Sequence, residues 1–148
     1  MSKIYERFYR SIKKYPNKIF IYNLKKKFTG KDCLLYLRKT EKFIKLNSFK
    51  SIGIKSINSF DWVILYLAAD KLCKKVFIIK NNTSLKTINK LKKMHNIDYI
   101  ANKIPKKIIK IKRKKSFDKI NSKRIDILFT SGTTDVPKGV IINENAFI

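Results

Sequence analysis

The chain has 148 residues, of which 44% are hydrophobic, with only 4 Gly and 3 Pro. This composition argues against a disordered, collagen-like or coiled-coil chain and favours one domain or part of a larger one. The longest apolar run, Trp62–Ala69, is far shorter than the ~20 residues of a membrane span. We therefore expect no membrane span. Two cysteines, Cys33 and Cys73, are too few for a disulfide framework, so we expect a cytoplasmic protein.

Charge is the most unusual feature of the composition. The chain carries 36 basic and 10 acidic residues, a net charge of +26, and 31 of the basic residues are Lys. Arg rather than Lys is favoured for bidentate contacts to phosphates and bases, and the lysines are spread along the chain, so we expect a solvated surface and no specific nucleic-acid partner. The alternative is a nucleic-acid-binding module centred on Lys103–Arg124, which holds eleven basic residues but a single aromatic, Phe117.

Hydrophobic spacing predicts the first elements. Ile4, Phe8 and Ile12 recur every four residues, which predicts an amphipathic helix that ends before Pro16. Lys18–Asn23 then predicts a short strand.

A turn and a capped helix are expected next. Lys25–Lys27 is polar and predicts a turn. Thr29 is placed to cap a helix that runs to about Leu46, and Asp32, three residues on, completes a capping-box pattern. The expected buried positions of this helix include Cys33, Leu37 and Ile44.

Strands and helices alternate through the rest of the chain. The predicted strands are Ser51–Lys55, Val76–Ile79, Asp98–Ala101, Ile125–Phe129 and Gly139–Ile142. The predicted helices are Phe60 to about Lys74, capped by Asn58 or Ser59, and one capped by Asn82 or Thr83 with Leu85, Ile88 and Leu91 on its buried stripe. The Lys-rich stretch 102–124 predicts a loop with a weak strand at Ile108–Ile111, and a new helix is expected near Asn143. Such alternation is typical of βαβ units, so the predicted fold class is α/β, a mainly parallel sheet flanked by helices.

Most potentially reactive side chains lack a catalytic or metal-binding pattern. His95 is the only histidine, and neither Cys33 nor Cys73 shows metal-ligand spacing with it. We therefore expect a surface or helix-end histidine, two buried cysteines, and no catalytic residue or metal ligand in this chain. Three further residues are expected to be structural: Asp61 and Asp70, facing solvent or capping charges locally, and Trp62, packed in the core.

One segment carries chemistry: the loop Thr130–Gly139 between the last two predicted strands. Its small hydroxyl residues and Gly132 allow backbone N–H groups to converge on anionic oxygens, and Lys138 adds a mobile positive charge. Polyphosphate is the natural ligand of such a loop. The loop is not a Walker A motif, because Pro137 and Gly139 stand where G-x-x-x-x-G-K-S/T requires Gly and Ser/Thr.

The segment FTSGTTDVPKGVIINENAFI resembles the phosphate-loop motif of the adenylate-forming (AMP-binding) superfamily of acyl-CoA synthetases, peptide-synthetase adenylation domains and luciferases. That motif commonly reads Y/F-T-S-G-S/T-T-G-x-P-K-G-V. The matching positions are Phe129 to Thr134, Pro137, Lys138, Gly139 and Val140. Upstream, YPNKIFIYN, FTGKDCLLYLRKTEKFIKL and SIGIKSINSFDWVILYLAADKLCKKVFII resemble the opening segments of the same family, in the same order.

The resemblance implies a fold, a reaction and a set of ligands. The fold would be the N-terminal part of a large α/β domain, and the reaction would join ATP and a carboxylic acid into an acyl-adenylate with release of pyrophosphate. Transfer of the acyl group to a thiol, of coenzyme A or a carrier protein, would follow. Mg²⁺ would help to stabilise the negative charge of the phosphates, and its protein ligands would lie outside this chain. The residues that would bind the β- and γ-phosphates of ATP are Thr130, Ser131, Gly132, Thr133, Thr134 and Lys138.

Two features depart from the family pattern. Asp135 stands where the family usually has Gly. The family motifs for adenine, ribose, magnesium and the C-terminal catalytic lysine have no counterpart in the sequence, so we expect residues 1–148 to be the N-terminal portion of an AMP-binding domain, truncated after residues 130–139 and without a second domain. An inactive remnant of such a ligase is the remaining alternative.

The Asp135→Gly substitution is expected to raise ATP affinity in a completed enzyme. At ~5 Å from a phosphate charge and an effective dielectric constant near ~20, the Asp135 carboxylate would repel it by on the order of 3 kcal/mol. Calorimetric titration with ATP checks this, and unchanged or weaker nucleotide binding would contradict it.

Overall fold

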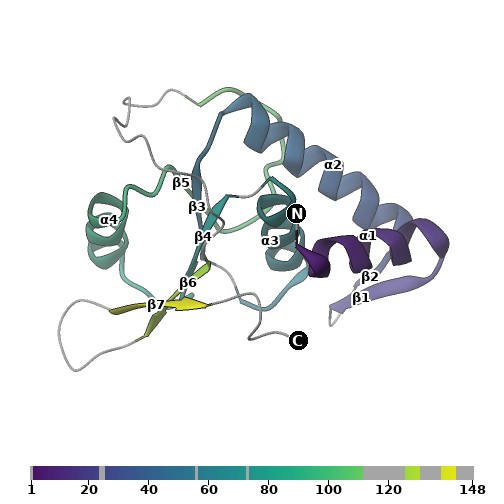
Figure 1. Ribbon diagram of the computed structural model, residues 1–148, viewed down its shortest axis with the longest axis horizontal. Coiled ribbons are helices and arrows are strands. Elements are labelled where there is room, and N and C mark those ends of the chain that lie inside the picture. The colour runs from purple at the N-terminus through teal and green to yellow at the C-terminus, as the bar shows by residue number, and fades with distance from the viewer. Residues whose placement is uncertain are drawn as a thin grey trace.

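A computed structural model of the chain describes residues 2–23, 26–55, 57–72, 74–111, 126–130 and 138–142 (Figure 1). The helices are α1 (Lys3–Lys14), α2 (Gly30–Leu46), α3 (Phe60–Lys71) and α4 (Leu85–Met94). The strands are β1 (Ile19–Asn23), β2 (Lys26–Thr29), β3 (Ser51–Lys55), β4 (Lys75–Ile79), β5 (Tyr99–Ala101), β6 (Asp126–Thr130) and β7 (Lys138–Ile142).

Five of the strands form one sheet, in the order β5-β3-β4-β6-β7. Strands β5, β3, β4 and β6 are parallel, and β7 pairs antiparallel with β6. Helix α4 lies on one face of the sheet and α1, α2 and α3 lie on the other (Figure 1). The predicted α/β class, a mainly parallel sheet flanked by helices, is therefore confirmed.

The residues of β4 show why both faces of this sheet are covered. Val76 and Ile78 pack into the hydrophobic cluster that contains α3, whereas Phe77 and Ile79 pack into the cluster that contains α4. A strand that is buried on both faces must be apolar at successive positions, which explains the continuous run from 76 to 79.

Helix α3 is covered on nearly every side. Its residues 64–70 are all buried, because the helix packs on the sheet and also against α1 and α2. Ser59 is its N-cap, one of the two predicted caps, and the helix ends at Lys71 rather than at about Lys74.

The burial of α3 overturns the expectation for Asp70, which is 0% exposed rather than facing solvent. Its carboxylate accepts a hydrogen bond from the hydroxyl of Ser2, the residue that caps α1. Asp61 is half-buried and accepts a hydrogen bond of 2.8 Å from the backbone N–H of Ile104. A buried carboxylate requires hydrogen-bond donors. For Asp70 and Asp61 on α3, these donors come from distant parts of the chain.

The prediction of a turn at Lys25–Lys27 is wrong for its described residues. Lys26 and Lys27 belong to β2, where they pair with Asn23 and Tyr22 of β1 in an antiparallel hairpin. Both lysines are exposed, so their polar side chains carry no burial penalty in the strand. Polarity alone therefore could not distinguish an exposed strand from a turn.

The start of α4 differs from the prediction as well. Its N-cap is Ser84 rather than Asn82 or Thr83, and the Ser84 hydroxyl accepts a hydrogen bond from the backbone N–H of Thr87. Ile88 and Leu91 are buried as expected, but Leu85 is 75% exposed. Leu85 is the first residue of the helix.

The weak strand predicted at Ile108–Ile111 is not formed. The side-chain amide of Asn47 instead donates to the backbone carbonyl of Ile109 and accepts from the backbone N–H of Ile111, at 3.0 and 2.7 Å. An amide side chain offers the same donor and acceptor as a peptide group, so Asn47 at the end of α2 pairs with this segment in place of a strand. The expectations for Ile125 and for a helix near Asn143 lie outside the described residues.

The capping box predicted at the start of α2 is present and gives a testable stability effect. The Thr29 hydroxyl accepts from the Asp32 backbone N–H, and the Asp32 carboxylate accepts from the Thr29 backbone N–H at 2.8 Å. We expect Thr29→Ala to lower the free energy of unfolding by about 1 kcal/mol in urea titrations at neutral pH. Thr29→Ser is the control and should retain most of that stability.

The same box predicts a dependence on pH. The backbone N–H and then the hydroxyl of Thr29 hold the pKa of Asp32 below its usual value. The stabilisation is therefore complete above the ordinary carboxyl pKa and is lost as the pH falls through the lowered pKa. An unfolding difference between wild type and Asp32→Asn that stays constant down through the acid range would contradict this account.

Candidate functional site

The predicted phosphate loop joins the last two strands of the sheet. Thr130 at the end of β6 pairs with Lys138 at the start of β7, so residues 131–137 connect two strand ends that lie side by side. The structure thus places the backbones of two candidate residues, Thr130 and Lys138, next to each other. The other four, Ser131, Gly132, Thr133 and Thr134, lie outside the described residues.

This loop begins at the carboxyl edge of the parallel strands. In the parallel pairing of β4 and β6, Val76 lies opposite Asp126 and Ile78 opposite Leu128, so both strands end at the same edge, as β3 does beside them. In open α/β sheets, ligands bind outside the carboxyl ends of the strands. The sheet therefore places the loop where such folds hold their ligands.

The start of β6 is fixed by a buried hydrogen bond. The Tyr66 hydroxyl on α3 donates to the Asp126 carboxylate at 2.7 Å, and both residues are buried. Trp62, one turn earlier on α3, is half-buried and stacks on Tyr66 at a ring distance of 5.3 Å; it packs against the core, as predicted.

The other end of β6 is held by aromatic packing. Phe129 is 3% exposed, and its ring stacks on Phe77 of β4 at 5.9 Å. His95 is the C-cap of α4, and its ring lies 5.2 Å from that of Phe129 and 5.7 Å from that of Phe77. His95 is thus a helix-end residue, as expected, and it supports the strand that leads into the loop.

Gly139 fits closely into the same packing. It lies opposite Phe129 across the β6–β7 hairpin. A Cβ atom at position 139 would be 3.0 Å from Ile127 Cγ2, closer than most such contacts, and at an ordinary contact distance of 3.4 Å from Phe129 Cε1. The glycine of the K-G pair therefore lets β7 approach β6 at the base of the loop.

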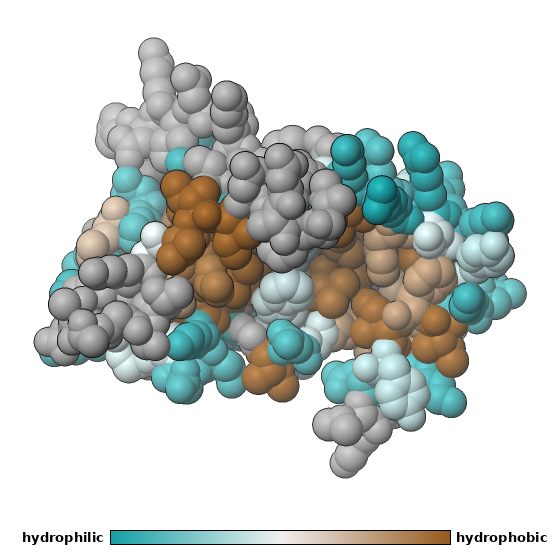
Figure 2. Space-filling view, turned by 60° about the horizontal axis from the view of Figure 1, so that its bottom comes forward, coloured by the Kyte–Doolittle hydropathy of each residue, from teal (hydrophilic) through white to brown (hydrophobic). Residues whose placement is uncertain are grey.

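Hydrophobic side chains are exposed on the face of the molecule that includes this edge (Figure 2). Ile57 after β3 and Val140 and Ile141 on β7 are all exposed, Ile141 by 67%. A contiguous exposed apolar surface is typical of a surface that binds a ligand or another polypeptide segment.

The described residues hold neither a reactive cysteine nor a metal-binding cluster. Burial raises the pKa of the Cys33 thiol to about 11, so this cysteine is protonated at neutral pH and is a buried hydrophobic residue, as expected; Cys73 lies outside the description. Among the residues whose placement the structure gives, no three His, Cys, Asp or Glu side chains gather to hold a metal ion. No helix within that part of the chain is long and apolar enough to cross a membrane.

The residues that support the loop were not identified from the sequence. Tyr66 and Asp126 are sixty positions apart, and the sequence assigned no role to either. Phe77 had only a strand assignment. The one available signal was the alternation within β4 and β6, which places Phe77 and Phe129 on the same face of adjacent strands.

Known proteins resemble this chain in structure. No protein-family profile and no curated protein matches it in sequence. The N-terminal subdomain of Klebsiella oxytoca NpsA, in complex with 3-hydroxyanthranilyl-AMSN, superposes with a TM-score of 0.66 at 16% identity over 93% of this chain and 40% of that one. Bacillus subtilis MenE, an O-succinylbenzoate coenzyme A synthetase in complex with AMP, gives 0.63 at 15% identity over 90% and 41%.

A third structure is an artificially fused adenylation–PCP di-domain, NpsA-ThdA of Klebsiella oxytoca, with a TM-score of 0.67 at 17% identity over 95% of this chain and 32% of that one. The chain thus spans about two fifths or less of the length of these proteins. At 15–17% identity these matches show the fold alone, and this chain has the fold of the N-terminal subdomain of NpsA.

Replacing Gly139 by Val is expected to disrupt the base of the loop. The added side chain would collide with Ile127 and Phe129, and overpacking of this kind costs about 1–3 kcal/mol. We expect a lower melting temperature together with weaker pyrophosphate binding, measured by thermal unfolding and calorimetry. Ile141→Val is the control on the same strand, because its exposed side chain should leave both quantities nearly unchanged. Equal stability of the two variants would contradict the role of Gly139.

Proposed function

We propose that this chain supplies the ATP-phosphate-binding part of an enzyme that activates a carboxylic acid as an acyl-adenylate. The observation that carries the proposal is the position of the Thr130–Gly139 motif, whose flanking strands β6 and β7 bring its ends together at the carboxyl edge of the sheet. The fold adds support, since NpsA and MenE, which share it, are an adenylation protein and a coenzyme A synthetase.

The proposed roles follow from the chemistry of the bond that breaks. A carboxylate oxygen attacks the α-phosphorus of ATP, the bond from that phosphorus to the oxygen bridging to the β-phosphate breaks, and pyrophosphate leaves with the electron pair. Negative charge therefore grows on the β- and γ-phosphates. The N–H and hydroxyl groups of Thr130, Ser131, Gly132, Thr133 and Thr134 and the ammonium of Lys138 would stabilise that charge.

We further propose that the acyl group then passes to a thiol. The acceptor would be coenzyme A or a carrier protein, because MenE is named as a coenzyme A synthetase and NpsA was studied as a fusion with a PCP domain. Binding of the adenine, the ribose and the acid would require further elements of the kind that the matched proteins carry in their remaining length.

Mg²⁺ would lower the charge of the triphosphate. No cluster of carboxylates, histidines or cysteines suited to a metal ion is found among the described residues. We therefore propose that the magnesium ligands lie outside these residues.

Lys138→Ala is expected to weaken pyrophosphate and ATP binding by the 148-residue chain. A charge-assisted hydrogen bond is worth about 1.5–3 kcal/mol, which corresponds to a loss of affinity of roughly tenfold or more. Isothermal titration calorimetry at moderate salt measures this effect.

The control must separate a loop contact from the general attraction of a chain with a net charge of +26 for anions. Lys107→Ala serves for this, because Lys107 is an exposed lysine of the Lys-rich stretch and its loss changes the net charge equally. Should the two variants weaken binding to the same degree, or should duplex DNA bind more tightly than ATP with a steep salt dependence, the proposed function would be wrong.

A further inference from the structure

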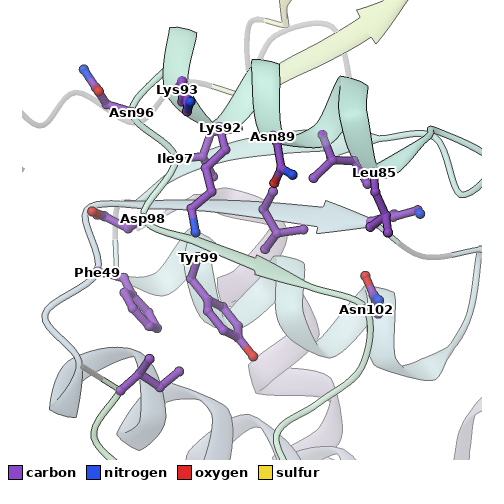
Figure 3. Close-up of a pocket in the computed structure, with 14 residues that line it drawn as sticks. Phe49, Leu85, Asn89, Lys92, Lys93, Asn96, Ile97, Asp98, Tyr99 and Asn102 are labelled. Carbon is purple, nitrogen blue, oxygen red and sulfur yellow. The ribbon is translucent and has the colours of Figure 1, made fainter. Parts of the chain in front are cut away.

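A cavity of about 900 Å³ lies at the other end of the sheet, between α4 and the edge strand β5 (Figure 3). None of its lining residues belongs to the Thr130–Gly139 loop, and strands β3, β4 and β6 separate it from β7 in the sheet order. The cavity is therefore distinct from the proposed phosphate site, and what it binds does not depend on the proposed function.

Among the described residues, the edge of the sheet is open at this cavity. Strand β5 is three residues long, and in that part of the chain it pairs with β3 alone. Residues Asp98, Tyr99, Ile100 and Asn102, which form β5 and its two ends, line the cavity. An edge strand presents backbone N–H and C=O groups on its outer side, and these groups can pair with a strand from another chain.

Apolar side chains flank this edge on both faces of the sheet. Ile100 packs toward the cluster around α4, and Tyr99 packs toward the cluster around α2 and α3. Leu85 and Ile88 of α4 line the cavity on the first face, and Ile111 lines it beyond Tyr99 on the second. A strand added beside β5 would therefore find apolar contacts for side chains that point to either face.

The rim of the cavity is positively charged. Lys55, Lys92 and Lys93 line it, and Asp98 is the only acidic residue of the lining. Asp98 accepts hydrogen bonds from the backbone N–H groups of Lys50 and Ser51, at 2.6 and 3.2 Å, and thereby fixes the start of β5.

The lysines on α4 are available to a ligand. Lys92 and Lys93 are exposed, and the two ion pairs found in the described part of the chain, Arg10–Glu6 and Lys71–Glu41, involve neither of them. The Lys92 side chain extends from α4 across the cavity toward Tyr99 (Figure 3).

We propose that this groove binds an extended acidic segment of a partner protein, which adds to β5 as a strand and alternates apolar with Asp or Glu residues. Backbone hydrogen bonds to β5 give affinity, and the apolar walls and lysine rim select the side chains. A second copy of this chain is disfavoured, because the same lysines would face each other on chains of net charge +26. Nucleic acid fits less well, since the lining holds no Arg and its floor is apolar.

The test uses the 148-residue chain and a fluorescently labelled synthetic peptide that alternates valine and glutamate. Fluorescence anisotropy measures binding to wild type, to the Lys92→Gln/Lys93→Gln variant and to the Lys86→Gln/Lys90→Gln variant. The control pair lies on the same helix, is exposed and carries the same charge, but lies outside the cavity lining. We expect the first variant to bind roughly fivefold or more weakly and the control to stay within about twofold of wild type.

Two further measurements make the test specific. Methylating alternate backbone nitrogens of the peptide should abolish binding if it adds as a strand, and the bound peptide should slow amide hydrogen exchange at Tyr99–Ala101. No binding by wild type, equal weakening by both lysine pairs, or unchanged binding of the methylated peptide would overturn the proposal. So would a labelled RNA oligonucleotide that binds more tightly than the peptide and loses affinity in the Lys92/Lys93 variant, because the groove would then be a nucleic-acid surface.

Discussion

The packing of Phe129 determines where the candidate phosphate loop lies. Its ring stacks on Phe77 of the neighbouring parallel strand and faces Gly139 across the antiparallel hairpin. The first contact aligns the carboxyl end of β6 with that of β4, and the second lets β7 return close beside it. A loop that is held at both ends in this way begins and finishes at one edge of the sheet, where nucleotide-binding α/β folds place phosphates.

Much of the fold could be predicted because its strongest signals are local. The strand at Ser51–Lys55 and the Thr29 capping box follow from residues that lie within a few positions of each other. The errors arise where the outcome depends on a pairing or a burial that the residue types themselves do not show. Lys26 is in a strand because Asn23 is its pairing partner, Asp70 is buried because α1 and Ser2 cover it, and Asn47 replaces a strand at Ile108–Ile111 through its own amide.

The candidate site likewise has a part that the sequence predicted and a part that it did not. The motif itself was visible as a run of residue types, and so were the strands on either side of it. Its supports were not visible, since the Tyr66–Asp126 hydrogen bond and the contact of His95 with Phe129 join positions far apart in the chain. The two ends of the sheet also differ in what they offer. The sequence at the β7 end has hydroxyl residues, glycine and one lysine, for which we propose a compact polyanion, whereas the β5 end has apolar walls and several lysines, for which we propose an extended acidic segment.

The most direct test of the central claim follows the backbone N–H groups themselves during a titration with pyrophosphate. In two-dimensional NMR spectra of the nitrogen-15-labelled chain, the amide signals of Ser131, Gly132, Thr133 and Thr134 should move together and saturate at one ligand per chain. The amides around Lys106 and Lys107 should remain nearly in place. Shifts that spread over the lysine-rich surface without saturating, or none at residues 131–134, would contradict the account.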